Sequence, residues 1–302
     1  MRTVGTVNEL RTLLGFERRA ERLIGLVPTM GALHAGHRSL IERARQRCDL
    51  VVVSLFINPA QFTERADLEN YPRREEHDAG LAAEAGVDVL FAPAVEEVYP
   101  PGFATTVEVL GLTDRMEGAV RGSEHFRGVC TVVTKLLCMV GPDVAFFGQK
   151  DAQQVVVIRR LAADLNLPVA IEACPTVREP DGLAMSSRNQ LLSAEQRARA
   201  LALPAALDAA LQLSAAGELS VEALLARARA VMAPFGVEPE YLELVDCVTL
   251  EPLLSLERGG LLAIAARIGD VRLIDNVLLP PGTDAVPRLS SAEPALAASA
   301  AP

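Results

Sequence analysis

Residues 23–48, LIGLVPTMGALHAGHRSLIERARQRC, decide the fold that this sequence predicts. The apolar run at residues 23–28 is typical of a strand, and glycines then interrupt the pattern. From residue 37 onward, Leu40, Ile41 and Ala44 recur on one face of a helix that the pattern predicts to residue 48. A strand, a glycine-containing turn and a helix in this order form the first unit of an alternating α/β fold.

The same alternation continues through the first half of the chain. The next segment, LVVVSLFI at residues 50–57, is apolar throughout, as expected for a strand covered on both faces. Further strands are predicted at residues 87–91, 144–147 and 169–173, and helices at residues 73–85, 128–140 and 151–165, the last with Asp151 as its N-cap. The first half therefore predicts a Rossmann-like, doubly wound parallel sheet.

The pattern changes after about residue 176. Alanine-rich helices are predicted at residues 193–211 and 221–232, and Ser193 with Gln196 forms a candidate capping box. Strands are predicted at residues 241–245, 261–266 and 271–274, with a hairpin joining the last two. We therefore predict a Rossmann-like catalytic domain at residues 1–176, a smaller α+β lid domain at 177–282 and a disordered Ala/Pro-rich tail at 283–302.

Composition narrows the class of protein. Half of the 302 residues are hydrophobic, and the formal net charge is −10, so nucleic acid is not an expected partner. No apolar run approaches the roughly 20 residues that span a bilayer, and the first residues lack a secretory signal pattern, so a membrane is not an expected partner either. Five dispersed cysteines are predicted to be reduced thiols of the core, which favours a cytoplasmic protein.

The first candidate site is PTMGALHAGH, residues 28–37. Gly31 and Gly36 allow a sharp turn and a close approach of a ligand, and the following helix N-terminus offers N–H groups to phosphate. His34 and His37 lie three residues apart, so both can point into one cleft and bind phosphoryl oxygens. A zinc site is the alternative, but metalloprotease histidines lie four apart with a Glu between them, unlike this spacing.

Two later segments carry further groups that suit a nucleotide. In FFGQKDAQQ, residues 146–154, Gly148 gives backbone access, Lys150 can reach phosphate and Asp151 can cap the helix or bind ribose hydroxyls. In VREPDGLAMSSRN, residues 177–189, two serine hydroxyls and an arginine suit a triphosphate. Because this second segment lies where the α/β pattern ends, it can act as a lid at a domain junction.

Together with FINPAQF at residues 56–62 and YPR at 71–73, these segments resemble the pantothenate synthetase family. That family belongs to a nucleotidyltransferase group that shares its fold with class I aminoacyl-tRNA synthetases. HAGH at residues 34–37 is similar to the group's first histidine signature, and MSSRN at 185–189 is similar to its second, mobile signature. The resemblance runs from about residue 27 to residue 192 and continues weakly through the smaller domain.

The resemblance implies an ATP-using ligase that works in two steps. Pantoate attacks the α-phosphorus of ATP to give pantoyl adenylate and pyrophosphate, and the amine of β-alanine then attacks the adenylate and releases AMP. It also implies a Rossmann-like domain with a small lid domain, a homodimer, and Mg²⁺ as cofactor. The Mg²⁺ would be held mostly by phosphates and water, with at most one or two carboxylates.

The resemblance also implies roles for particular residues. The catalytic residues would be His34, His37, Lys150 and Arg188, with His37 as the proton donor. Gln61 and Gln154 would bind the substrates pantoate and β-alanine, and Asp78 is the candidate metal-facing carboxylate. The ATP-binding residues would be Met30, Gly31, Ala32, Leu33, His34, Ala35, Gly36, His37, Gly148, Gln149, Lys150, Asp151, Val177, Met185, Ser186, Ser187 and Arg188.

Two departures and two alternatives accompany the resemblance. His77 stands where the family commonly has an acidic residue, which leaves Asp78 as the better metal-facing candidate. The loop RGSEHF at residues 121–126 has one residue more than the family's form, which leaves Arg121 and His125 without an assigned role. One alternative is a nucleotidyltransferase that moves AMP or CMP onto a phosphorylated substrate; it would need more cations near Gln61 than this sequence has. The other is a non-catalytic nucleotide-binding regulator, which would not need two histidines, a lysine and an arginine together.

Overall fold

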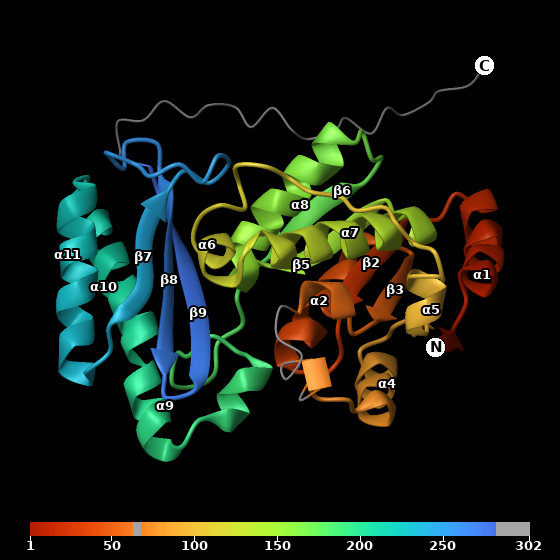
Figure 1. Ribbon diagram of the computed structural model, residues 1–302, viewed down its shortest axis with the longest axis horizontal. Coiled ribbons are helices and arrows are strands. Elements are labelled where there is room, and N and C mark those ends of the chain that lie inside the picture. The colour runs from red at the N-terminus through yellow and green to blue at the C-terminus, as the bar shows by residue number, and fades with distance from the viewer. Residues whose placement is uncertain (63–67, 70, 282–302) are drawn as a thin grey trace.

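A parallel six-stranded sheet organises the larger part of the molecule in a computed structural model that describes residues 1–62, 68–69 and 71–281 (Figure 1). The strands lie in the order β1-β4-β3-β2-β5-β6. Their bounds are β1 (Arg2–Val4), β2 (Ile24–Thr29), β3 (Leu50–Leu55), β4 (Val89–Phe91), β5 (Val144–Gly148) and β6 (Ala170–Cys174). The central strands β2 and β3 are almost wholly buried, as their continuous apolar runs require.

Helices cover both faces of this sheet. One face packs against α1 (Val7–Arg19), α7 (Ser123–Val140) and α8 (Ala152–Asp164). The other packs against α2 (Ala35–Arg47) and α4 (Glu75–Glu84). Two short helices, α5 (Val95–Val98) and α6 (Glu117–Arg121), lie in the connection between β4 and α7. The expected doubly wound sheet is therefore confirmed.

The order of the strands fixes where a ligand can bind. After β2 the chain adds β3 and β4 on one side, whereas β5 and β6 lie on the other side. Connections that leave β2 and β5 in opposite directions open a crevice at the carboxyl ends of these neighbouring strands. The turn before α2 and the 3-10 helix η2 (Gln149–Asp151) both begin at this crevice.

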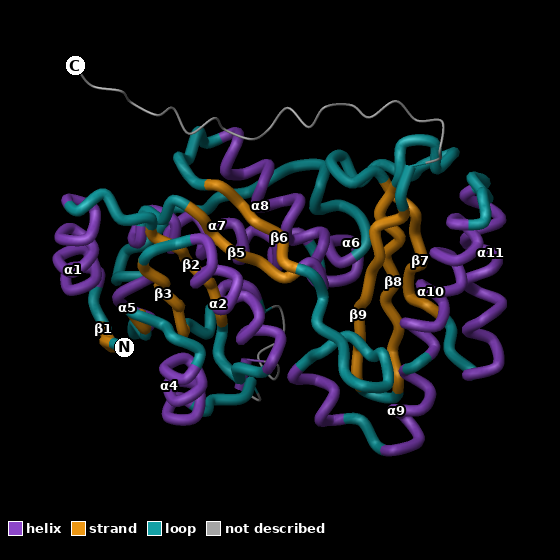
Figure 2. Tube along the Cα trace, turned by 180° about the vertical axis from the view of Figure 1, so that it is seen from behind, coloured by secondary structure: helices purple, strands orange, loops and turns teal. Residues whose placement is uncertain are grey.

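A smaller antiparallel sheet follows, made of β7 (Pro239–Val245), β8 (Gly260–Ile268) and β9 (Val271–Leu279). Figure 2 shows it between the larger part and the outer helices. Its outer face packs against α9 (Ala194–Ala200), α10 (Ala202–Ala215) and α11 (Val221–Met232). Its inner face packs against α7, α8 and the segment around Leu112, so the two parts share a hydrophobic core. Short 3-10 helices are η1 (Pro59–Gln61), η3 (Ser187–Leu191) and η4 (Ala233–Phe235).

The helix predicted at residues 193–211 is instead two helices that separate at Leu201. Pro204 lies in the first turn of α10, where its missing N–H costs nothing, whereas it would break a continuous helix. The capping box of Ser193 and Gln196 is confirmed. Helix α1 was not predicted, although Thr6 and Glu9 form a capping box that the sequence displays.

Other expectations have mixed outcomes. Asp151 occupies the N-cap position of α8 but makes no capping hydrogen bond. All five cysteines are free, but Cys138 and Cys247 are exposed, so the expectation of core thiols was wrong for these two. No helix in residues 1–62, 68–69 and 71–281 is long and apolar enough to cross a bilayer. The predicted tail, residues 283–302, lies outside the described residues.

Candidate active site

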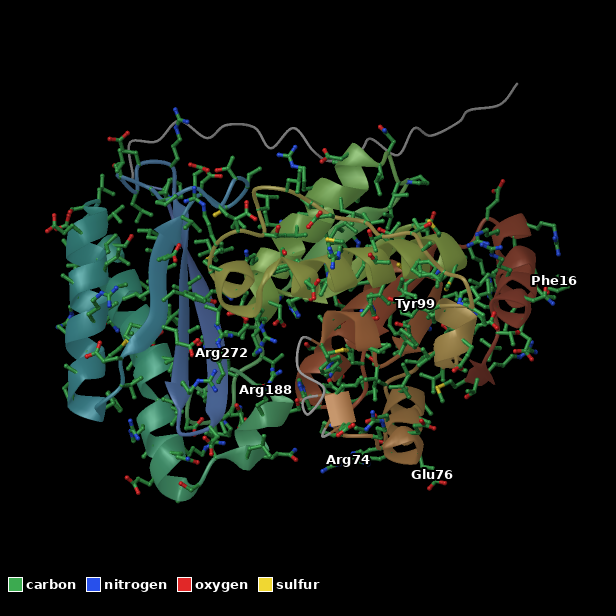
Figure 3. The ribbon with its side chains drawn as sticks, in the orientation of Figure 1. Phe16, Arg74, Glu76, Tyr99, Arg188 and Arg272 are labelled. Atoms are coloured by element: carbon green, nitrogen blue, oxygen red, sulfur yellow. The ribbon has the colours of Figure 1, made fainter. Side chains whose placement is uncertain are left out.

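A cleft of about 330 Å³ opens at the crevice between β2 and β5 and is lined by residues of both parts of the molecule. Figure 3 shows Arg188 and Arg272 between the larger part and the small sheet, whereas Glu76 and Phe16 lie at the periphery. The cleft brings together fourteen of the predicted site residues: Met30, His34, Gly36, His37, Gln61, Gly148, Lys150, Asp151, Gln154, Val177, Met185, Ser186, Ser187 and Arg188.

Several predicted ATP-binding residues lie beside this cleft. Ala32, Leu33 and Ala35 line an adjoining cavity of about 270 Å³, which shares His34 and Met185 with the main cleft. Gly31 and Gln149 line neither of these two cavities. Gln149 instead donates a hydrogen bond from its side chain to Asn276 at 3.2 Å, which turns its amide toward the small sheet.

The turn before α2 is held by one buried carboxylate. Gly31 and Ala32 both have positive φ angles, 92° and 51°, which is costly for alanine. Asp78 is only 1% exposed, and its two oxygens accept hydrogen bonds from the N–H groups of Ala32 and Leu33, both at 2.8 Å. The hypothesis that Asp78 faces a metal is therefore wrong, because its oxygens are engaged by the backbone and it does not line the cleft.

The two histidines cap α2 reciprocally. Nδ1 of His34 accepts a hydrogen bond from the Gly36 N–H at 3.1 Å, and Nδ1 of His37 accepts one from the His34 N–H at 3.3 Å. Both neutral rings therefore carry their hydrogen on Nε2. The ring centroids are 4.2 Å apart, and a Cβ atom at position 36 would lie 2.8 Å from the His34 ring, so a larger residue there would displace that ring.

Burial keeps both rings neutral. It lowers the pKa of His34, and the positive charge of Lys150 lowers it further. Burial, followed by the charges of His34 and Lys150, lowers the pKa of His37 to about 3. At neutral pH the pair therefore presents two uncharged Nε2–H donors, which suits the expected donation of hydrogen bonds to phosphoryl oxygens.

The backbone of η2 is fixed by the small sheet. Asn276 on β9 is 5% exposed, and its Nδ2 donates to the carbonyl oxygens of Gln149 and Lys150, each at 2.9 Å. The ammonium of Lys150 lies 3.9 Å from the Asp151 carboxylate. Sequence reasoning missed Asn276, since nothing in its neighbourhood indicates a partner 126 residues earlier.

Gln61 is oriented by a buried asparagine that was not predicted. Asn58 is 1% exposed, and its Nδ2 donates to Gln61 Oε1 and to the Gly128 carbonyl, both at 3.1 Å. Tyr99 donates its hydroxyl to Asn58 Oδ1 at 2.8 Å. Gln61 can then point its Nε2 toward Met30 Sδ, 3.0 Å away. Asn58 lies within FINPAQF, one of the segments that resemble the family, but no role was predicted for it.

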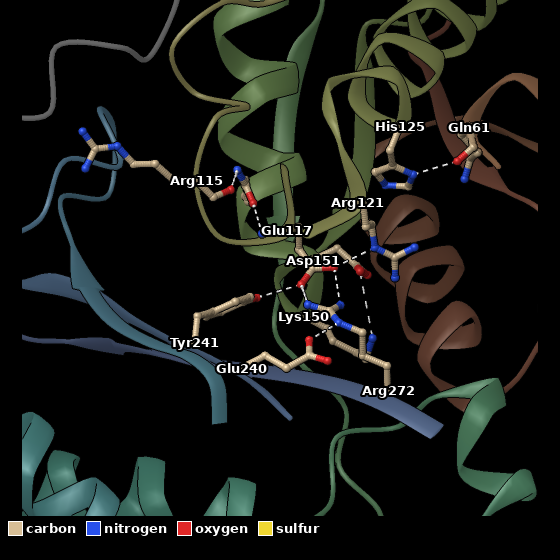
Figure 4. Close-up of polar contacts among 11 residues, drawn as sticks. Gln61, Arg115, Glu117, Arg121, His125, Lys150, Asp151, Glu240, Tyr241 and Arg272 are labelled. Carbon is tan, nitrogen blue, oxygen red and sulfur yellow. Dashed lines mark hydrogen bonds and ion pairs between the residues drawn. The ribbon is translucent and has the colours of Figure 1, made fainter. Parts of the chain in front are cut away.

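A buried ionic cluster at one end of the cleft was also not predicted (Figure 4). Glu117 accepts hydrogen bonds from Arg272 Nη1 and Nη2 at 2.8 and 2.7 Å, from the Tyr241 hydroxyl at 2.9 Å and from Arg121 Nε at 2.9 Å. Burial alone would raise the pKa of Glu117, but Arg272 and then Arg121 outweigh it and lower the pKa to about 2. The cluster joins α6 to β7 and β9, over 100 residues away in sequence.

Comparison with known proteins identifies the family of this cleft. The family model described as pantoate-beta-alanine ligase matches residues 2–278. The chain belongs to the pantoate–β-alanine ligase family. It is 55% identical to a pantothenate synthetase of Cereibacter sphaeroides over 273 residues, covering 90% of this chain and 97% of that protein. It is 49% identical to one of Pelotomaculum thermopropionicum, with 92% and 99% covered.

Solved structures of the pantoate–β-alanine ligase family agree. Pantothenate synthetase from Thermus thermophilus has a TM-score of 0.86 at 46% identity, covering 93% of this chain and all of that chain. The enzyme of Francisella tularensis, solved in complex with beta-gamma ATP and β-alanine, has a TM-score of 0.72 at 33% identity, with 92% and 97% covered. The predicted family, fold and ligase class are confirmed, which decides against the two alternatives weighed from the sequence.

Proposed function

We propose that this chain condenses pantoate with β-alanine at the expense of ATP, by way of a pantoyl adenylate, and releases AMP and pyrophosphate. The observation that carries the proposal is a single cleft at the strand crevice. Its lining includes two neutral histidines, Lys150, Arg188 and two amide side chains, Gln61 and Gln154. Cations suit the triphosphate, and amides suit a small hydroxy acid.

In the first step, a carboxylate oxygen of pantoate attacks the α-phosphorus and pyrophosphate leaves. Adenylyl transfer needs in-line positioning and charge stabilisation more than covalent help from the protein. Lys150 and Arg188 would stabilise the charge that builds on the departing pyrophosphate. His34 and His37 would donate hydrogen bonds from Nε2 to phosphoryl oxygens, because their Nδ1 atoms are engaged by the backbone.

We propose Mg²⁺ as the cofactor that accompanies ATP and neutralises part of the triphosphate charge when bound. Within the described ranges, no group of three His, Cys, Asp or Glu residues could hold a metal, so phosphates and water would supply most of its ligands. Asp151 fits as a protein ligand, since it lines the cleft and its side chain is half exposed. Glu117 and Asp275 fit less well, because their ion pairs with arginines are 2.7 Å long, whereas the Lys150 ammonium lies 3.9 Å from Asp151.

We further propose a cytoplasmic homodimer. Free thiols at all five cysteines suit a reducing compartment. Residues 104–110 form a connection without a described helix or strand, and Leu110 within them is 79% exposed. An exposed apolar side chain of this kind can pack against the same segment of a second copy.

The decisive test is exchange of labelled pyrophosphate into ATP. Exchange should require pantoate and proceed without β-alanine, because the adenylate forms before the amine reacts. Lys150→Ala should slow exchange by about 10²–10³ with an unchanged thermal melt, because it removes a fixed cation from the transition state. Lys150→Arg should restore only part of the rate.

The control for this test is Arg160→Ala, which removes an exposed cation from α8, the helix that follows Lys150. It should leave exchange unchanged. Exchange without pantoate, exchange only in the presence of β-alanine, or a Lys150→Ala rate within about threefold of the parent would each contradict the proposal.

A further inference from the structure

The cations that line the cleft outnumber those expected to bind ATP. Among the described residues of its lining, the arginines and lysines are Arg121, Lys150 and Arg188. Lys150 and Arg188 belong to the two segments proposed to bind the triphosphate. Arg121 comes from the end of α6, in the loop that had no assigned role. Arg121 is therefore a cation of the cleft that neither of these two segments supplies.

Arg121 has a free end. Its Nε donates to Glu117 Oε2 at 2.9 Å, whereas its two Nη atoms make no hydrogen bond to any residue in the described ranges. Arg272 differs, because both of its Nη atoms bind Glu117 and its Nε binds Glu240 at 2.5 Å. Glu117 therefore orients Arg121 without saturating it, and leaves a planar pair of donors that matches a carboxylate (Figure 4).

A hydrogen-bond acceptor lies beside this fork. His125 Nδ1 is 2.8 Å from the carbonyl oxygen of Gln61. A carbonyl oxygen can only accept, so Nδ1 carries the hydrogen and Nε2 carries the lone pair. Burial lowers the pKa of His125, against the opposing effect of the hydrogen bond to the Gln61 carbonyl and with a contribution from the charge of Arg121, so the ring is neutral at pH 7. Its tautomer is opposite to that of His34 and His37.

The proposed reaction has two organic substrates with carboxylates, and their fates differ. The carboxylate of pantoate is consumed when it becomes the acyl group of the adenylate, so amides serve it well. The carboxylate of β-alanine stays charged from entry to product, so it calls for a permanent cation. The amine lone pair attacks the acyl carbon, the bond from acyl carbon to phosphate oxygen breaks, AMP leaves with that electron pair, and a proton must leave the nitrogen.

We propose that Arg121 binds the carboxylate of β-alanine through its two Nη atoms and that His125 Nε2 accepts the proton from the attacking amine. The inference rests on the proposed function. The two side chains would then act on opposite ends of β-alanine. The Arg121 guanidinium selects the carboxylate, and the His125 imidazole, beside Gln61, receives the proton of the amine. Glu117 acts as a positioning residue, since it holds Arg121 Nε.

The first test compares Arg121→Met with Arg115→Met. Arg115 lies in the same loop, pairs on the surface with Glu251 and points away from the cleft in Figure 4. In Arg121→Met the KM for β-alanine should rise about 10²-fold, and the preference for β-alanine over n-propylamine should collapse, because a charge-assisted pair is lost. The pantoate KM in pyrophosphate exchange should change by less than about threefold. Arg115→Met should change none of these values.

Two results would overturn the role of Arg121: an unchanged β-alanine KM, or a raised pantoate KM with an unchanged β-alanine KM. Arg121→Lys keeps the charge and should restore part of the β-alanine affinity, and it carries the test if the methionine variant melts early. Wild-type enzyme without pantoate-dependent exchange would instead refute the proposed function. The two failures are therefore distinguishable.

The second test uses His125→Asn, whose amide can still donate to the Gln61 carbonyl but offers no basic nitrogen. Release of AMP from preformed pantoyl adenylate with β-alanine should slow by about 10²-fold, and the pH profile of this step should lose its histidine limb. Pyrophosphate exchange serves as the internal control and should stay within about threefold. A normal rate of amide formation would overturn the role of His125.

Discussion

The cleft is lined by two loops that are held in different ways. The histidine loop, residues 28–37, is fixed by the interior of the larger part. The junction segment, residues 177–189, is held by hydrogen bonds and ion pairs over most of its length and exposes Arg188 near its end. The contrast indicates which groups hold a set position before ligands bind and which can adjust when they do.

The histidine loop has its polar groups satisfied internally. Asp78 takes two of its N–H groups, and the histidines cap α2 and each other's backbone. Because each ring is locked at Nδ1, its Nε2–H has a fixed direction. Such a site makes its electrostatic contribution without reorganising during the reaction.

The junction segment is anchored on either side of its functional stretch. Before it, Arg178 makes a bidentate ion pair with Asp275, which is 2% exposed, at 2.7 and 3.1 Å. After it, buried Asn189 donates to the side chain of Glu179 and to the Ala184 carbonyl. Between these anchors Arg188 is exposed, so its guanidinium can adjust to a ligand.

The two loops meet at one backbone N–H. Gly36 donates to Nδ1 of His34 at 3.1 Å and to Sδ of Met185 at 3.2 Å. A thioether is a weak acceptor, so a phosphate oxygen at the N-terminus of α2 would replace it with a gain in hydrogen-bond strength. Ligand binding would then change the junction segment and leave the histidine loop in place.

The largest expected effect comes from breaking the fixed loop. Asp78→Ala should lower the free energy of unfolding by roughly 3–5 kcal/mol, because two N–H groups of a loop with positive φ angles lose a charged partner. Pyrophosphate exchange should fall by at least about 10² as the histidines lose their positions. Glu76→Ala removes an exposed acid from the same helix and serves as the control in both urea unfolding and exchange. Equal free energies of unfolding for Asp78→Ala and Glu76→Ala would show that the histidine loop keeps its conformation without Asp78.

The role of Asp78 also shows which features could be predicted from the sequence and which could not. The apolar alternation predicted the doubly wound sheet, because periodicity reports burial directly. The motifs placed His34, Lys150 and Arg188 at one crevice, because loops after parallel strands gather at their carboxyl ends. The chemistry of Asp78 was misjudged, since a carboxylate bound to backbone N–H groups and one facing a metal look alike in sequence. The contacts of Asn276 and Arg272 with the larger part were also not predicted. They form only because the small sheet packs against that part, which no local sequence pattern indicates.

A second expected effect concerns pH and the same fixed loop. The pKa of His37 falls from 6.5 in an unfolded chain to about 3 in the folded protein. Below pH 6.5 the unfolded chain therefore binds a proton that the folded chain does not, and stability falls as pH falls toward 3. The slope contributed by this group approaches about 1.4 kcal/mol per pH unit.

This dependence is measurable between pH 6.5 and 5 by urea unfolding. His37→Gln should reduce the slope by close to one proton in that range, whereas His77→Gln, at an exposed position on α4, should leave it unchanged. Identical slopes for the parent and His37→Gln would mean that the folded protein accommodates a charged ring at position 37. The histidine loop would then be less fixed than its hydrogen bonds indicate.

The smallest expected effect separates the two serines of the junction segment. Ser186 Oγ accepts a hydrogen bond from the Arg188 N–H at 3.3 Å and so caps η3, whereas the Ser187 hydroxyl has no hydrogen-bond partner among the described residues. Ser187→Ala should therefore change stability by less than about 0.5 kcal/mol. It should still slow pyrophosphate exchange by up to about tenfold, since its hydroxyl is available to the triphosphate. Ser186→Ala should affect both, because it also removes the cap. A Ser187→Ala variant with parental exchange and lowered stability would contradict this role. The Ser187 hydroxyl would then stabilise the fold and would not donate to the triphosphate.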